Sequence, residues 1–300
     1  MKGLVRRALL ARPVNLSVRT ALAPLPRRRL PDALWRRLPV VGDFPVALPG
    51  GGRFRYRSRG EYLGRELYWR GVASFEPGSA EVVARLAATV DGFWDVGAYS
   101  GLYTLIAAAA RPGLSVAAFE PLPENFAWLR ANLELNGLRA VEAVAAAVTE
   151  TDGGTIDLWV PTEPWTSEAT VTPGPRAGAD SCRPLSVPSV SIDGFRERWT
   201  GPPPGLIKID AEGAEVAILA GARQTLDECR PILLCELLPR PDESLEATRR
   251  LLSATGYRWG VVTAAGVVRR ERLEPSREHR NQLLWPAESE SVAEAAGLLR

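Results

Sequence analysis

The chain of 300 residues is 46% hydrophobic and is therefore long enough to bury a large core. Residues 1–37 carry ten basic residues against the single acidic Asp32, whereas the remaining 27 basic and 34 acidic residues give the rest of the chain a net charge of −7. This acidic body argues against a nucleic-acid partner, and three scattered cysteines with one histidine argue against a Cys/His zinc site and fit a reducing cytoplasm.

The N-terminal extension spans residues 1–43 and is rich in arginine and proline. Four apolar residues between Leu4 and Leu9 can share one face of a short helix, which allows a weak peripheral contact of residues 1–37 with an anionic membrane surface. Because this amphipathic stretch is so short, a solvated or loosely docked tail is the favoured interpretation. No apolar run approaches the length of a membrane span, so we expect a cytoplasmic protein that is at most peripheral at the inner membrane face.

An α/β domain is predicted over residues 44–290, followed by a tail at 291–300. Short β-like segments surround a glycine turn at 49–52, and a helix over 81–90 leads into a regular alternation of strands and helices. Repeated units of this kind imply a doubly wound, mostly parallel sheet with helices on both faces. After a first strand that ends at Asp95, strands are expected at 114–119, 141–148, 206–209, 232–235, 257–262, 266–269 and 282–285, and helices at 102–110, 124–136, 214–228 and 243–255.

The segment 161–188 interrupts this alternation and is rich in Pro, Gly, Ser and Thr. An irregular loop of this length inside a domain is unusual and often serves as a lid or a binding loop. A flexible surface insertion is the alternative, and the composition favours neither.

The run F-W-D-V-G-A-Y-S-G at 93–101 predicts a strand, a tight glycine loop and the start of a helix. In a βαβ unit this arrangement brings the backbone close to a nucleotide at the helix N-terminus. Glu120 follows Gly101 by nineteen residues, at the end of the next strand, where a carboxylate can accept hydrogen bonds from both ribose hydroxyls. The pattern therefore indicates a cofactor of the adenosine type.

The spelling of the loop indicates which cofactor. A dinucleotide fingerprint has a glycine where this chain has Asp95. A carboxylate would be repelled by a pyrophosphate and attracted by the amino group of S-adenosylmethionine (SAM). Asp95, Gly97 and Gly101 therefore favour SAM over NAD, and an ordinary strand-to-helix turn in another α/β protein remains the alternative.

A second motif, I-K-I-D-A-E-G-A-E at 207–215, runs from a strand to the start of a helix. Asp210 comes at the carboxyl edge of the sheet, where open α/β sheets bind ligands. Glu215 falls in the first helical turn, which the helix dipole explains without a role in catalysis. Lys208 is one of only two lysines, and we expect it to form an ion pair with a neighbouring carboxylate.

Together these motifs resemble the FkbM family of SAM-dependent methyltransferases. The resemblance covers a core at about 70–286, and its motifs are D-V-G-A-Y-S-G-L-Y-T at 95–104, F-E-P-L-P-E-N-F at 119–126, A-N-L-E-L-N-G at 131–137, S-I-D-G-F at 191–195, I-K-I-D-A-E-G-A-E at 207–215, P-I-L-L-C-E-L at 231–237 and N-Q-L-L-W-P at 281–286. It implies a Rossmann-like seven-stranded sheet, mostly parallel, with one reversed strand near an edge. It also implies O-methylation of a sugar, glycolipid or polyketide-type product, so the expected partner is a small-molecule or glycolipid hydroxyl acceptor. No oligomeric state follows from it.

By position, the resemblance implies that Asp95, Gly97 and Gly101 line the methionine part of SAM and that Glu120 holds the ribose. The run at 144–147 is entirely apolar, so backbone groups would have to recognise the adenine. Asp210 would face the methyl group and the acceptor. The full set of predicted cofactor-binding residues is Asp95, Gly97, Ala98, Tyr99, Gly101, Thr104, Glu120, Pro121, Asn125, Ala146, Ala147 and Asp210.

A neutral hydroxyl needs a proton acceptor as its new bond forms. Asp210 is the first candidate base, followed in order by Glu212, Glu236 and His279. His279 lies in a charged segment that reads as a surface loop, although its ordinary pKa suits base catalysis. We expect no metal, because two separated carboxylates, Asp210 and Glu236, are a thin basis for one. An NAD(P)-dependent oxidoreductase and a non-catalytic adapter that retains the fold are the alternative functions.

Overall fold

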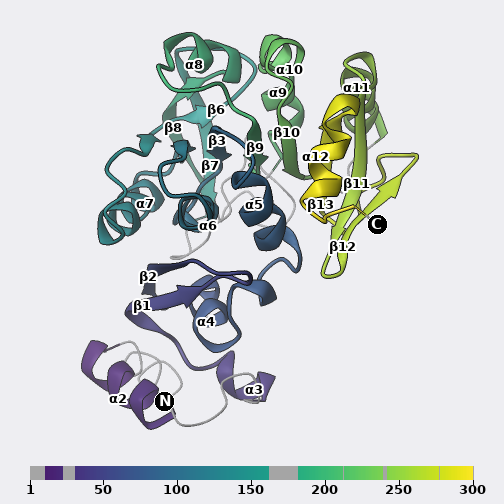
Figure 1. Cartoon of the computed structure of the whole chain (residues 1–300). Helices are drawn as coiled ribbons and strands as arrows, with labels where there is room; N and C mark the ends of the chain where they lie inside the picture. The colour runs from purple at the N-terminus through teal and green to yellow at the C-terminus, as the bar shows by residue number, and fades with distance from the viewer. Residues whose placement is uncertain are drawn as a thin grey trace.

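A computed structural model describes residues 11–22, 31–161, 182–211, 213–238, 242–276 and 278–299. Its centre is an eight-stranded sheet in the order β12-β11-β13-β10-β9-β3-β4-β5 (Figure 1). Five neighbouring strands from β10 to β5 are parallel, and β13 runs antiparallel to β10 and β11. The strands are β3 (Gly92–Val96), β4 (Ser115–Phe119), β5 (Glu142–Val144), β9 (Leu206–Ile209), β10 (Ile232–Glu236), β11 (Tyr257–Thr263), β12 (Gly266–Arg270) and β13 (Asn281–Pro286).

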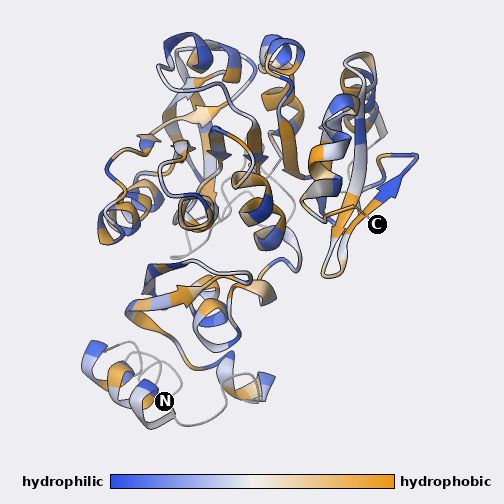
Figure 2. Cartoon of the chain, viewed as in Figure 1, coloured by the Kyte–Doolittle hydropathy of each residue, from blue (hydrophilic) through white to orange (hydrophobic). Residues whose placement is uncertain are grey.

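This topology confirms the predicted α/β class, the mostly parallel sheet and the reversed strand near one edge. β12 lies where a strand was expected at 266–269; it runs antiparallel to β11 as a second reversed strand and gives the sheet one strand more than the seven that the family resemblance implied. Figure 2 shows that the central strands are hydrophobic and that β12 ends in hydrophilic residues, which are Arg269 and Arg270. An edge strand that ends in charges resists pairing with further strands.

Helices cover both faces of the sheet, which explains why β3, β9 and β10 are buried at every position. Successive side chains of β3 enter different cores: Phe93 packs in the core with α5, α6 and α7, and Trp94 packs in the core with α8 to α11. The first group is α5 (Ser79–Ala87), α6 (Leu102–Ala110) and α7 (Pro123–Leu135), and the second is α8 (Ile192–Arg198), α9 (Glu215–Ala220), α10 (Arg223–Glu228) and α11 (Asp242–Ala254). Near the C-terminus, η4 (Ala287–Ser289) and α12 (Glu290–Ala295) follow β13.

Three sequence predictions need correction. The strand expected at 141–148 is broken, because β6 (Ala147–Val148) leaves the main sheet and joins β7 (Thr155–Pro161) and β8 (Cys182–Val190) in a three-stranded sheet. Residues 182–188, expected in a loop, belong to β8. Among the described strands, β8 pairs only with β7 over these residues, because β6 joins it at Ser189 and Val190, and prolines are compatible with a strand that has one open edge. The rest of that loop, 162–181, lies outside the described residues. The helix expected at 214–228 is two helices. The Gly221 carbonyl oxygen between them accepts from the Asp193 amide at 2.9 Å, and the Asp193 side chain accepts from the amides of Gln224 and Thr225 at the start of α10, at 3.0 and 2.8 Å.

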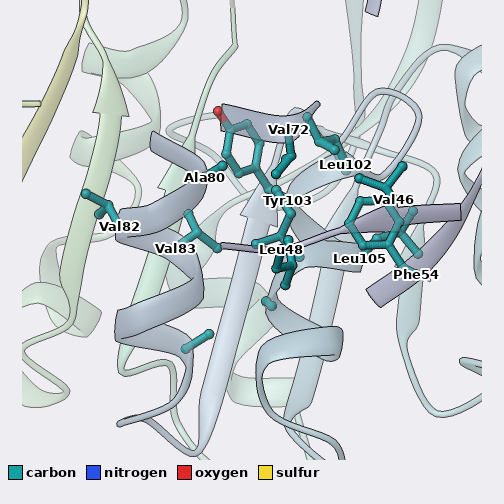
Figure 3. Close-up of a cluster of buried hydrophobic side chains, with 14 of the residues drawn as sticks. Val46, Leu48, Phe54, Val72, Ala80, Val82, Val83, Leu102, Tyr103 and Leu105 are labelled. Carbon is teal, nitrogen blue, oxygen red and sulfur yellow. The ribbon is translucent and has the colours of Figure 1, made fainter. Parts of the chain in front are cut away.

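The N-terminal part forms a module beside the sheet, which we define as residues 31–77. It contains α3 (Asp32–Trp35), a hairpin of β1 (Val41–Ala47) and β2 (Arg53–Arg59), α4 (Tyr62–Trp69) and η2 (Val72–Ser74). Side chains from the hairpin, η2, α5 and α6 form one buried cluster, which includes Leu48, Phe54 and Leu105 (Figure 3). The module is therefore packed against α5 and α6 of the α/β domain.

Helix α2 (Arg12–Leu22) is docked on this module. The Asn15 side chain donates to the Pro39 carbonyl oxygen at 2.6 Å and accepts from the Val41 amide at 2.9 Å, and the Arg19 guanidinium lies 4.4 Å from the Tyr68 ring centroid. Strand β1 begins at Val41, inside the extension predicted at 1–43. Among the described helices, none is long and apolar enough to span a membrane.

The loop after β3 generates a stability prediction. Gly97 has a φ of +78°, and a Cβ there would lie 1.8 Å from the carbonyl oxygen of Asp210. Gly113 has a similar φ of +85° with open space around it, so Gly113→Ala should cost only the backbone strain, about 1–2 kcal/mol. Gly97→Ala should cost clearly more, about 3 kcal/mol or above, in urea unfolding. Equal losses would show that the close approach to Asp210 does not constrain the loop.

Candidate functional site

A cavity of about 620 Å³ lies at the carboxyl ends of β3, β4, β9 and β10. Open parallel sheets bind their ligands at this edge. The N-terminal module forms one wall, and the segment before β13 forms another. The predicted site residues that line the cavity are Gly97, Ala98, Tyr99, Glu120, Pro121, Ala146, Ala147, Asp210, Glu236 and His279.

The glycine loop joins the ends of three neighbouring strands. The amides of Gly97 and Ala98 both donate to the carbonyl oxygen of Phe119, at 3.0 and 2.9 Å, which ties the loop to β4. The Asp210 amide donates to the carbonyl oxygen of Val96 at 3.0 Å, which ties it to β9. Backbone hydrogen bonds therefore tie the loop to β4 on one side and to β9 on the other.

Glu120 is held by the backbone at the end of β4. Its Oε2 accepts from the Tyr99 amide at 2.8 Å, and its Oε1 accepts from the Leu122 amide at 2.9 Å and from the Asn125 side chain at 3.5 Å. Burial raises the pKa of Glu120 to about 7, against the opposing effect of these bonds. Since a carboxylate has about four lone-pair sites, Glu120 retains acceptor capacity toward the cavity. Asn125 does not line the cavity and acts here by orienting Glu120.

Asp95 does not line the cavity. Its Oδ2 accepts from the amide and the hydroxyl of Thr104, at 2.9 and 2.7 Å, so it anchors the first turn of α6 beneath the loop. Its Oδ1 is buried and has no hydrogen-bond partner within the described ranges. Burial raises the pKa of Asp95, although Lys208 acts in the opposite direction. The predicted contact of Asp95 with the cofactor stays a prediction, as do the contacts of Gly101 and Thr104, which also lie outside the lining.

The wall expected to face the adenine is apolar. Ala146, Ala147, Leu122 and Leu158 line it together with Pro121. This agrees with the sequence, in which the corresponding run has no polar side chain for the adenine amine.

Three carboxylates gather at the other end of the cavity, and we call Glu76, Asp210 and Glu236 the carboxylate cluster. One oxygen of each lies within 4.8 Å of the others. Lys208 is 2% exposed and donates to Asp210 at 2.9 Å, as expected for an ion pair, and Arg280 lies 2.8 Å from Glu236. These two cations supply positive charge to the cluster, and the expectation of no metal stays a prediction.

The three carboxyl groups differ in their pKa. For Asp210, burial acts upward, but the Lys208 ammonium and hydrogen bonds hold the pKa below its ordinary range. For Glu236, burial and the Asp210 charge raise the pKa to about 9, so Glu236 holds a proton at neutral pH. For Glu76, burial and the Asp210 charge raise the pKa, and Lys208 opposes them.

Sequence reasoning missed Glu76, which lies outside every recognised motif. The fold brings it to the cluster from the end of the N-terminal module, and the Glu76 side chain accepts hydrogen bonds from Tyr103 and Asn281. Its backbone is unusual, with a φ of +44°, but a backbone angle cannot be read from the sequence. His279 lies in an exposed loop, as expected, and this loop also lines the cavity. Glu212 lies outside the described residues.

Comparison with known proteins identifies the family. A family model described as the methyltransferase FkbM domain matches residues 95–259, more than half of the chain. The chain belongs to the FkbM methyltransferase family. This confirms the resemblance inferred from the motifs, and SAM is the cofactor of this family.

Individual relatives match over part of their length. The 31-O-demethyl-FK506 methyltransferase FkbM of Streptomyces tacrolimicus is 37% identical over 94 residues, which are 29% of this chain and 32% of that protein. The structure of methyltransferase FkbM from Methylobacillus flagellatus has 20% identity and a TM-score of 0.42, over 65% of this chain and 43% of that one. An O-methyltransferase from Bacillus cereus, solved with SAH, has 14% identity and a TM-score of 0.41, over 71% and 82%. The chain thus spans about a third of the first relative and less than half of the second.

The pKa of Glu120 leads to a prediction on stability. The folded value of about 7 exceeds the ordinary 4.5, so the contribution of this group is fully present below pH 4.5 and is lost as the pH rises through 7. The shift corresponds to a loss on the order of 3 kcal/mol. Urea unfolding of Glu120→Gln should lack this loss, so the variant gains stability relative to the wild type between pH 4.5 and 7.5. A constant difference over that range would contradict the assignment.

Proposed function

We propose that this protein transfers a methyl group from SAM to a hydroxyl oxygen of a sugar, glycolipid or polyketide-type natural product. The observation that carries the proposal is the single cavity shared by Glu120 at one end and the carboxylate cluster at the other. Family membership supports the methyl donor. The Streptomyces relative is named a 31-O-demethyl-FK506 methyltransferase, which supports a natural-product hydroxyl as acceptor.

The residues present fit SAM. Glu120 offers fixed acceptor oxygens for the ribose hydroxyls, and the apolar wall at Ala146 and Ala147 suits the adenine ring. The loop at 97–99 lines the cavity between Glu120 and Asp210, where the methionine part would extend. Asp95 would act on that part through the loop that it anchors.

Bound SAM supplies a methyl group that is already electrophilic. The protein therefore has to hold the acceptor oxygen in line with the methyl group and exclude competing water. Orientation of this kind can contribute roughly 7–11 kcal/mol to the barrier reduction. The carboxylate cluster supplies the hydrogen-bond acceptors that hydroxyl groups need for such positioning.

Asp210 is suited to orienting the acceptor. Lys208 keeps its carboxylate ionised, so it can accept a hydrogen bond from a hydroxyl group at neutral pH. The same ion pair lowers its pKa and makes it a weaker proton acceptor than the sequence suggested. A weak membrane contact through residues 1–37 would bring a glycolipid acceptor close, but the cavity suits a small-molecule acceptor equally.

Calorimetric titration tests the cofactor. Wild-type protein should bind SAM and SAH, and Glu120→Gln should weaken both by about 10-fold or more, since the ribose loses a charged acceptor. Glu124→Gln changes an exposed glutamate of the adjoining helix and should leave the affinity unchanged. Binding of NAD without binding of SAM would reject the proposal in favour of an oxidoreductase.

Replacement of Asp210 separates binding from turnover. Asp210→Asn should leave the SAM affinity within about threefold but lower kcat by about 100-fold, measured as SAH release with a panel of methyl glycosides and macrolide polyols. Asp157→Asn, on the exposed side of β7, is the matched control. Full turnover by Asp210→Asn on an acceptor that the wild type methylates would exclude an orienting role for this carboxylate.

A further inference from the structure

Glu76 joins the carboxylate cluster from a different part of the chain than Asp210 and Glu236, which follow β9 and end β10. It belongs to the N-terminal module, immediately before α5, and lies outside the residues 95–259 that match the family model. It nevertheless lines the same cavity as Asp210 and Glu236. The family motifs therefore do not account for it.

The two hydrogen bonds to Glu76 fall on one oxygen. Its Oε2 accepts from the Tyr103 hydroxyl and, at 3.2 Å, from the Asn281 amide group. Its Oε1 accepts no hydrogen bond from the residues that the structure describes, so one face of the carboxylate remains for a ligand in the cavity. Tyr103 is itself buried in the cluster that joins the module to α6 (Figure 3). Oε2 of Glu76 is therefore held by the protein, and Oε1 is available to a ligand.

Backbone strain accompanies this placement. Glu76 has a φ of +44°, a left-handed conformation that is unusual for a residue with a side chain. Such conformations persist where the surrounding structure enforces them, and they gather at functional sites. Here Tyr103 and Asn281 hold the Glu76 carboxylate, one oxygen of which lies within 4.8 Å of oxygens of Asp210 and Glu236.

Charge distribution in the cluster distinguishes the three carboxylates. Lys208 forms an ion pair with Asp210, and Arg280 forms one with Glu236. Glu236 also shares a hydrogen bond with Asp210. Burial and the Asp210 charge raise the pKa of Glu236, which favours its protonated form. The Lys208 ammonium lowers the pKa of Asp210, which makes Asp210 a weaker proton acceptor. Burial and the Asp210 charge raise the pKa of Glu76, and its Oε1 has no partner among the described residues, so this oxygen is placed to take up a proton from a ligand in the cavity.

We propose that Oε1 of Glu76 accepts the proton of the acceptor hydroxyl during methyl transfer. The inference rests on the proposed function. The O–H bond of the acceptor breaks and its proton passes to Glu76, while the oxygen forms the new O–C bond with an electron pair. The S–C bond of the cofactor breaks at the same time, and its electron pair stays on sulfur. The proton later leaves Glu76 for solvent through the open cavity.

A carboxyl titration tests this without an acceptor. The protein is labelled with ¹³C-glutamate and saturated with SAH, and the carboxyl resonances of Glu76 and Glu236 are assigned by their loss in Glu76→Gln and Glu236→Gln. On raising the pH, the Glu76 resonance should show ionisation of its carboxyl group at a lower pH than the Glu236 resonance. The Glu76 carboxyl then becomes ionised, and able to accept a proton, while Glu236 is still protonated. The reverse order would overturn the proposal, because Glu76 would then be the last carboxyl group to lose its proton.

Kinetics provide the second arm. On a methyl glycoside or macrolide polyol that the wild type methylates, Glu76→Gln should lower kcat by about 100-fold or more, leave the acceptor KM nearly unchanged and remove the rise of kcat with pH. Glu81→Gln, on the neighbouring α5, is the matched control. An unchanged kcat in Glu76→Gln would reject Glu76 as the proton acceptor and leave the proposed function standing. Failure of the wild type to bind SAM and SAH would instead reject the proposed function.

Discussion

The buried ammonium group of Lys208 is the interaction on which the two halves of the site depend. It lies at the centre of the sheet on β9, is 2% exposed, and pairs with Asp210 at 2.9 Å. Burial acts to lower its pKa, but the charges of Asp210, Asp95 and Glu76 raise it above its ordinary value. Removing such a charge from water costs several kcal/mol unless it is paired. The carboxylates that surround Lys208 are therefore needed to stabilise its buried charge, and they are also the candidate functional groups.

This one cation links the loop at 95–101 to the carboxylate cluster. Asp95 lies beneath the loop and anchors α6, while Asp210 and Glu76 face the cavity, and all three interact with Lys208. The ring of Tyr103 also lies 4.6 Å from the Lys208 Nζ atom, a distance suited to a cation–π contact. A compact ammonium serves several neighbours in this way, whereas a planar guanidinium would favour one bidentate partner. Asp95 beneath the loop and the carboxylates that face the cavity thus interact with the same buried charge.

The parts of the site that could be predicted are those whose partners lie within one βαβ unit. The loop at 95–101, Glu120 and the Lys208–Asp210 pair follow from local spacing and from the rule that parallel strands share a carboxyl edge. Glu76 could not be predicted in this way, since its partner Asn281 is 205 residues distant in the chain. The break between β5 and β6 and the split at Gly221 have the same origin, because each depends on contacts with distant backbone that no local pattern encodes.

The two ends of the cavity are assembled in different ways. The end proposed for the cofactor is built from segments that are neighbours in the sheet and are joined by backbone hydrogen bonds, as at Gly97 and Ala98. The acceptor end is assembled from the N-terminal module, the β9 and β10 edges and the segment before β13, which side-chain bonds such as Asn281 to Glu76 hold together. The module also reaches the loop at 95–101, because the Tyr56 hydroxyl lies 2.8 Å from the Ser100 hydroxyl. Under the proposed function, the module therefore supports both ends of the cavity: it supplies Glu76 to the carboxylate cluster and packs against the loop that would hold the methyl donor.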